Sequence, residues 1–122
     1  MKKNILVIDD DPFAQKMIVA ALEGEGHAAV ASLNFKDALQ KAHQTPPELV
    51  LIDVVMPDIS GFEACRQIKA MFQPHPPPVI VMTGKLDAVD PVLARKMGAD
   101  DFVVKTSDMA VLIQAVRKIL LS

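Results

Sequence analysis

The chain has 122 residues, of which 51% are hydrophobic, and its formal net charge is −2 at pH 7. This length fits one domain, residues 1–122, with a single hydrophobic core. Because Lys and Arg form no block and the net charge is slightly negative, we expect no direct binding of nucleic acid or of an anionic membrane surface.

Short apolar runs alternate with segments of helical periodicity along the whole chain. The expected strands cover residues 4–9, 27–31, 49–53, 78–82 and 101–105. The second strand has the weakest signal, because its residues are small and few are β-branched. Strands that alternate with helices indicate βαβ units. The sequence therefore predicts an α/β fold: a doubly wound, five-stranded parallel sheet with helices on both faces.

Helix start and stop signals lie between these strands. Asp11 is expected to cap the first helix, with Pro12 at its first position and Gly24 and Gly26 as its stop. The expected N-caps of the later helices are Asn34, Ser60 (in a capping box with Glu63), Asp90 (before Pro91) and Ser107.

Polar side chains stand at the C-terminal ends of four of the expected strands. In chain order they are Asp9, Asp10 and Asp11, then Asp53, then Thr83, and finally Lys105. Ligands bind at this edge of an open α/β sheet. Carboxylates, a hydroxyl and an ammonium group together suit a hard cation and a phosphoryl group.

The acidic residues at this edge favour a bound cation. Carboxylates that meet there repel one another by about 4 kcal/mol per close pair at a surface-like dielectric, whereas Mg²⁺ is often held by one or two carboxylates plus a phosphate. Asp53 is also a candidate covalent phosphoryl acceptor, and Lys105 a charge clamp for the anion. Taken singly, these residues have ordinary explanations as well, namely helix caps, a turn threonine and a solvated lysine.

Four segments together resemble the receiver domain of response regulators in two-component signal transduction, of the chemotaxis-regulator type. They are residues 5–11, 51–61, 81–84 and 98–105, and they occur in the family's order and spacing. The resemblance covers essentially the full chain. It implies a flavodoxin-like sheet with strand order 2-1-3-4-5.

The resemblance also implies a function. A phosphohistidine on a sensor histidine kinase or a histidine phosphotransfer protein would donate a phosphoryl group to Asp53, with Mg²⁺ as cofactor. The domain would then signal to a downstream protein or an effector domain. It would be no classical enzyme, although it would assist its own phosphorylation and dephosphorylation. The implied metal ligands are Asp9, Asp10, Asp53 and the backbone carbonyl of Val55; Thr83 and Lys105 would contact the phosphoryl group, and Thr83 and Phe102 would form the switch.

The chain departs from the family pattern at three positions. Thr106 follows Lys105, where the family usually has a proline joined by a cis bond. We expect this bond to be trans, because a non-proline cis bond costs about 2.5–4 kcal/mol. Val55 and Lys85 border the expected phosphoryl position, and we expect them to influence how long the phosphoryl group survives.

The expected output surface consists of the fourth helix, the fifth strand and the fifth helix. Many related transcription factors dimerise there through opposed charges. In this chain Pro91, Val111 and Ala115 stand where such charges are expected. We therefore expect partner binding, or a different dimer, at this surface.

Targeting and redox signals indicate a cytoplasmic location. No apolar stretch approaches the roughly 18 residues of a membrane span, and residues 1–4 run directly into an apolar segment, so no signal peptide is expected. The single cysteine, Cys65, excludes an internal disulfide and fits a reducing compartment.

Three other functions are compatible with parts of the pattern. An aspartate-dependent phosphohydrolase needs a second acid two residues after the nucleophile, where this chain has Val55. An FMN binder needs a loop rich in Ser, Thr and Gly after the first strand, where residues 9–11 are acidic. An inactive receiver that serves only for docking would not need the acceptor, metal and clamp residues present here.

Overall fold

The computed structural model describes residues 2–84, 91–105 and 109–121, except for the side chains of Pro91 and Ala94. It contains a five-stranded parallel sheet with the order β2-β1-β3-β4-β5, as predicted. The strands are β1 (Asn4–Ile8), β2 (Ala28–Ser32), β3 (Leu49–Asp53), β4 (Val79–Thr83) and β5 (Asp101–Val104). The helices are α1 (Pro12–Gly24), α2 (Phe35–Gln44), α3 (Gly61–Met71), α4 (Pro91–Lys96) and α5 (Ala110–Leu121).

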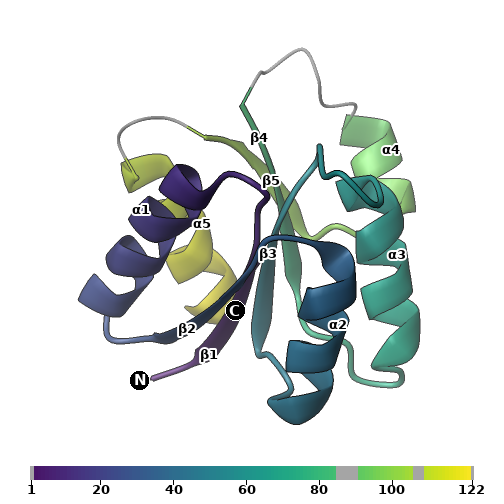
Figure 1. Ribbon diagram of the computed structural model, residues 1–122, viewed down its shortest axis with the longest axis horizontal. Coiled ribbons are helices and arrows are strands. Elements are labelled where there is room, and N and C mark those ends of the chain that lie inside the picture. Colours follow the sequence, from purple (N-terminus) through teal and green to yellow (C-terminus); the bar gives the residue numbers. More distant parts are fainter. Residues whose placement is uncertain (1, 85–90, 106–108, 122) are drawn as a thin grey trace.

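The helices form two layers, with α1 and α5 on one face of the sheet and α2, α3 and α4 on the other (Figure 1). Alternate residues of each strand pack against the two helix layers, because successive side chains of a strand point to opposite faces of the sheet. In β1, Ile5 and Val7 pack with α1 and α5, whereas Leu6 and Ile8 pack with α2 and α3. Both faces are covered, which explains why the strand sequences are almost continuously apolar.

Three predicted helix caps are confirmed. Asp11 accepts a hydrogen bond from the Phe13 amide, Asn34 accepts one from Asp37, and Ser60 accepts one from Glu63. The Glu63 carboxylate accepts hydrogen bonds from Arg66 and Gln67. The expected caps Asp90 and Ser107 lie outside the described residues.

The ends of four strands differ by one residue from the prediction, and the strand order is unaffected. His27 belongs to the turn after α1, because its amide donates to the Leu22 carbonyl. Gly26 in the same turn has a φ of 90°, a conformation that glycine adopts without strain. Asp9 and Lys105 follow β1 and β5 rather than ending them, so the backbone is free to turn where the polar side chains begin.

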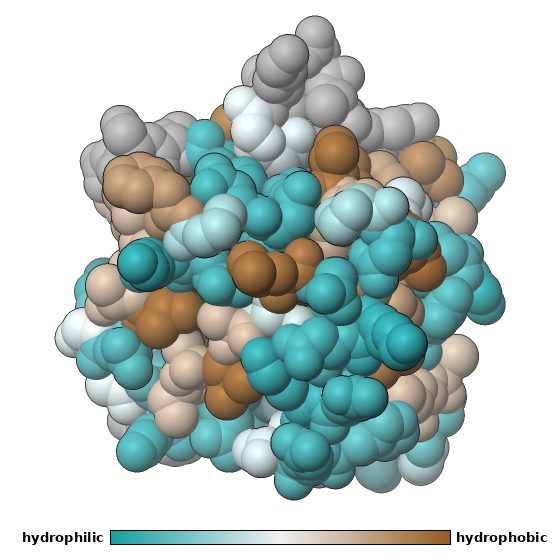
Figure 2. Space-filling model, in the orientation of Figure 1, coloured by the Kyte–Doolittle hydropathy of each residue, from teal (hydrophilic) through white to brown (hydrophobic). Residues whose placement is uncertain are grey.

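One face of the molecule is largely hydrophilic, with hydrophobic residues scattered among polar ones (Figure 2). Among the described residues, no helix combines the length and the hydropathy that crossing a membrane requires.

Candidate functional site

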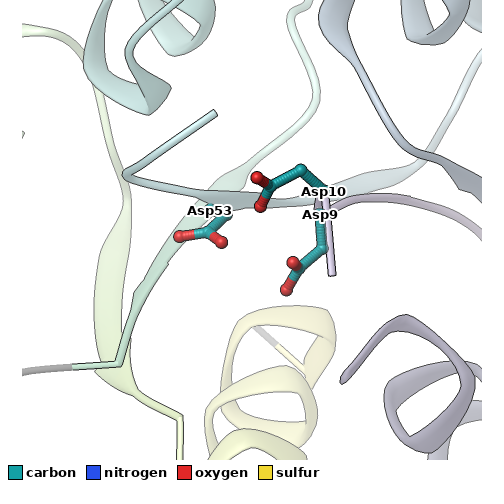
Figure 3. Close-up of side chains that lie close together, drawn as sticks. All are labelled: Asp9, Asp10 and Asp53. Atoms are coloured by element: carbon teal, nitrogen blue, oxygen red, sulfur yellow. The ribbon is translucent and has the colours of Figure 1, made fainter. Parts of the chain in front are cut away.

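An acidic cluster lies where β1 and β3 end. These strands pair in parallel, with Ile8 opposite Ile52, so the residues that follow them meet at one edge of the sheet. Asp9, Asp10 and Asp53 each place a carboxylate oxygen within 4.8 Å of the others. Figure 3 shows the three side chains gathered at the strand ends, with the Asp10 carboxylate directed toward Asp53. The pairing of β1 with β3 therefore creates a possible cation site.

The three carboxylates differ in their exposure to solvent. Asp9 is fully buried and Asp53 is only 7% exposed, whereas Asp10 is exposed. The Asp9 Oδ1 accepts a hydrogen bond of 2.9 Å from the Asp11 amide, which turns the chain toward α1. Asp11 itself caps α1, as expected. Buried carboxylates need compensating charge, since an unpaired buried ion is costly.

Lys105 supplies part of that charge. Its Nζ lies 2.9 Å from Asp9 Oδ2 and 3.1 Å from Asp53 Oδ2, and therefore bridges two carboxylates. The Lys105 amide also donates to the Thr83 carbonyl at 2.6 Å, which holds the end of β5 against β4. Lys105 is thus an internal ion-pair partner and not a solvated lysine.

Protonation of the site follows from burial and from these charges. Burial raises the pKa of Asp53, and the nearby Asp9 charge adds to this, although hydrogen bonds from Val55 and Lys105 act in the opposite direction. Burial alone would lower the pKa of Lys105, but the hydrogen bonds and charges of Asp9 and Asp53 raise it above its usual value. Lys105 therefore stays protonated, and the ionised form of Asp53 would gain from a further cation.

The loop after β3 is fixed to the sheet beside Asp53. The Val54 amide donates to the Met82 carbonyl at 2.8 Å, and its carbonyl accepts from the Gly61 amide at 2.8 Å. The Val55 amide donates to Asp53 Oδ1 at 3.2 Å. A Cβ on Gly61 would lie 2.1 Å from the Asp53 carbonyl oxygen, so this approach requires a glycine.

Thr83 and Phe102 occupy the two neighbouring strands. Thr83 ends β4 and is buried, in register with Val104. Phe102 is half-buried, as expected for a strand residue, and packs against the core cluster between the sheet and the layer of α2 and α3, as Leu93 and Met97 also do.

Two residues of the expected output surface differ in their exposure. Ala115 is 8% exposed and belongs to the cluster between α5 and the sheet, as do Leu112 and Val116. Val111 is 49% exposed. Lys85 and the bond between Lys105 and Thr106 lie outside the described residues.

Asp58 has a role that the sequence analysis missed. Its carboxylate accepts hydrogen bonds from the Phe35 and Lys36 amides at the start of α2. No local signal predicts this contact, because the partners are 22 and 23 residues away along the chain. The only indication in the sequence is general: the first helical amides always need acceptors.

The fold and the site define a doubly wound α/β domain that carries an acidic cluster and a lysine at the carboxyl edge of its sheet. The family described as "Response regulator receiver domain" matches residues 5–117. The chain belongs to this family.

Two relatives illustrate how widely the similarity extends. The DNA-binding response regulator MtrA of Mycolicibacterium smegmatis is 36% identical over 96% of this chain and 50% of its own length. Protein PilH of Pseudomonas aeruginosa is 34% identical over 96% of this chain and 97% of its own length. The chain thus spans half of one relative and nearly all of the other.

Solved structures show the same fold. The TrrA response regulator of Thermotoga maritima, in complex with Mg²⁺ and beryllofluoride, has a TM-score of 0.85 and 29% identity over 96% of this chain and 98% of its own. The beryllofluoride-activated DrrB receiver domain has a TM-score of 0.85 and 30% identity over 100% of both chains.

Proposed function

We propose that residues 1–122 form a single receiver domain that accepts a phosphoryl group on Asp53 from a phosphohistidine donor, in a Mg²⁺-dependent reaction. The observation that carries this proposal is the position of Asp53, with Lys105 Nζ 3.1 Å from Oδ2 and with Asp9 and Asp10 in the same cluster. A nucleophilic carboxylate, a fixed cation and further carboxylates for a metal are what transfer to an aspartate requires.

In the proposed reaction, a carboxylate oxygen of Asp53 forms a bond to phosphorus while the bond between phosphorus and the donor's histidine nitrogen breaks. The nitrogen keeps the electron pair of the broken bond. Lys105 holds one side of the acceptor carboxylate, and its ammonium group stabilises negative charge on the transferring oxygens. The Val55 amide, bonded to Asp53 Oδ1, orients the other side.

The donor set fits Mg²⁺. Asp9, Asp10, Asp53 and the Val55 carbonyl would hold it, all through oxygen atoms, which this hard cation prefers. The raised pKa of Asp53 indicates that the site lacks enough positive charge to favour the carboxylate fully. Bound Mg²⁺ would supply that charge and neutralise the phosphoryl oxygens.

Thr83 and Phe102 are the proposed switch. The Thr83 hydroxyl would hydrogen-bond the phosphoryl group, and Phe102 would move further inward. Phe102 of β5 and Leu93 of α4 pack against the same core cluster, and α4 contacts β5, which supports a path from the ring to that helix. The signal would leave through the surface formed by α4, β5 and α5, toward a protein partner or an effector domain.

The proposed setting is cytoplasmic signalling. The donor would be a sensor histidine kinase or a histidine phosphotransfer protein, and the domain would act as a signalling acceptor, not as an enzyme with a turned-over substrate. Direct contact with nucleic acid or a membrane is not expected, because the net charge is −2. The single buried thiol, Cys65, agrees with a reducing compartment.

Intact-protein mass spectrometry with acetyl phosphate tests the proposal. The wild-type protein should gain the mass of one phosphoryl group with Mg²⁺ and none with excess chelator. Asp53→Asn should abolish the gain, whereas Asp11→Asn, which alters a neighbouring carboxylate but keeps the α1 cap, should retain it. Uptake by Asp53→Asn at the wild-type rate would refute the assignment. Continuous release of phosphate from small phosphoesters would instead favour the phosphohydrolase.

A further inference from the structure

The N-terminus of α2 has two caps, and one of them comes from another part of the chain. Asn34 is the local cap, with its Oδ1 2.8 Å from the Asp37 amide. Asp58 supplies the second: its Oδ2 lies 3.1 Å from the Phe35 amide and 3.3 Å from the Lys36 amide. A carboxylate is well suited to this position, because first-turn amides lack partners and carry partial positive charge.

Asp58 belongs to the loop that contains the proposed metal ligand Val55. On the near side, the loop is held by the two backbone hydrogen bonds of Val54. Val55 itself has little side-chain support, since it is 67% exposed. Within the described residues, no donor is bonded to the Val55 carbonyl, which leaves that oxygen available to a cation.

Farther along, the loop is held by Met56, which is buried, and by the hydrogen bonds that Asp58 accepts from α2. Pro57 stands between Met56 and Asp58, and its fixed φ limits how far the backbone can change conformation between them. The contact between Asp58 and α2 therefore restrains Val55 from three residues away. A ligand held in place before binding loses less conformational freedom on binding than a mobile one.

We propose that Asp58 is a positioning residue: by anchoring the loop to the N-terminus of α2, it holds the Val55 carbonyl where Asp9, Asp10 and Asp53 can share a divalent cation with it. This inference rests on the proposed function. It also makes the start of α2 sensitive to the cation, because a coupling between two sites acts in both directions.

Two simpler roles for Asp58 give different results. A residue that only caps α2 would affect stability and leave the metal affinity unchanged, as Asn34 should. A residue that only adds negative charge near the cation would lose its effect equally in Asp58→Ala and Asp58→Asn, because both remove the charge. Only a positioning role separates these two variants, because asparagine keeps a carbonyl oxygen that accepts the amide hydrogen bonds.

Isothermal titration of the metal-free protein with MgCl₂ is the main test. Asp58→Ala should weaken Mg²⁺ binding by about three- to tenfold, somewhat less than the loss typical of residues that directly orient metal ligands. Asp58→Asn should remain within about twofold of wild type, and Asn34→Ala should match wild-type affinity despite its loss of a cap. Equal affinities for all the proteins, or equal losses in Asp58→Ala and Asp58→Asn, would overturn the inference.

Amide hydrogen exchange in the wild-type protein provides a test that needs no variant. Mg²⁺ should slow exchange at Phe35 and Lys36 more than at Asp37, whose amide is bonded to the local cap. Equal changes at all three amides would contradict the inference. A wild-type protein that binds no Mg²⁺ would overturn the proposed function as well, whereas normal wild-type binding with unaffected variants overturns the role of Asp58 alone.

Discussion

Lys105 and Asp9 form an ion pair in which the carboxylate is fully buried, with Nζ 2.9 Å from Oδ2. Such a pair is no guarantee of net stability, because removing two ions from water costs as much as their attraction returns. Removing only one partner of the pair is costly, because the charge of the other partner then stays buried without compensation.

Lys105→Met should therefore lower the free energy of unfolding by about 3–5 kcal/mol in metal-free buffer. Urea unfolding followed by circular dichroism measures this, since the chain has no Trp or Tyr for fluorescence. Lys118→Met, at an exposed position of α5, is the control and should have little effect. Mg²⁺ should restore part of the lost stability in the Lys105 variant, and a variant as stable as wild type would contradict the importance of the pair.

Gly61→Ala should destabilise the protein by at least about 1–3 kcal/mol, the usual cost of overpacking, because the new Cβ would lie 2.1 Å from the Asp53 carbonyl oxygen. The displaced backbone carries Asp53, so phosphoryl uptake should fall as well. Gly24→Ala is a matched control, since a Cβ there meets nothing within 4 Å. Wild-type stability and uptake in Gly61→Ala would show that the loop adapts without cost.

The Cys65 thiol should be unreactive in the folded protein. It is fully buried, and burial raises its pKa to about 11. Because the thiolate is the reactive form, Ellman's reagent at mildly alkaline pH should label the native protein only as fast as it unfolds. The same protein in concentrated urea should react at once. Rapid labelling without denaturant would mean that the helix carrying Cys65 opens locally.

The pKa of Glu63 offers a test of local electrostatics. Hydrogen bonds from Arg66, and to a lesser extent from Gln67, lower it to about 2. Because the pKa of Glu63 is lowered in the folded state, its interaction with Arg66 stabilises the protein fully at pH values above 4.5. This stabilisation is lost as the pH falls from 4.5 toward 2. In Arg66→Ala, an NMR titration should find the Glu63 midpoint moved most of the way back to 4.5. An unchanged midpoint would contradict this assignment.

The surface formed by α4, β5 and α5 should not support a charge-paired dimer. Val92 and Val111 are exposed on its two helices, and Ala115 is withdrawn into the core. Sedimentation velocity with and without beryllofluoride and Mg²⁺ should show no activation-dependent dimer that dissociates in high salt. Appearance of a tight, salt-sensitive dimer only in the activated state, through this surface, would refute the prediction.

Those parts of the site that lie at the ends of strands could be predicted from the sequence. Apolar runs identify buried strands, and a parallel sheet brings the residues after them to one edge, so Asp9, Asp53 and Lys105 could be placed together before any contact was known. The strand ends were less certain, because hydrophobicity does not record where ladder hydrogen bonds stop. Asp58 could not be predicted, since its role depends on how the loop after β3 meets α2. Burial of Ala115 could not be predicted either, because a small apolar residue fits a helix surface and a core equally well.

The ion pair that joins Lys105 to Asp9 spans 96 positions of the chain. Asp9 and Asp53 leave the ribosome long before Lys105 does, so a nascent chain carries both acids before it has the lysine that pairs with them. The lysine's positive charge reaches the site only after the fifth strand has been made. A product of premature termination before residue 105 would keep the acids and lack the lysine that pairs with them.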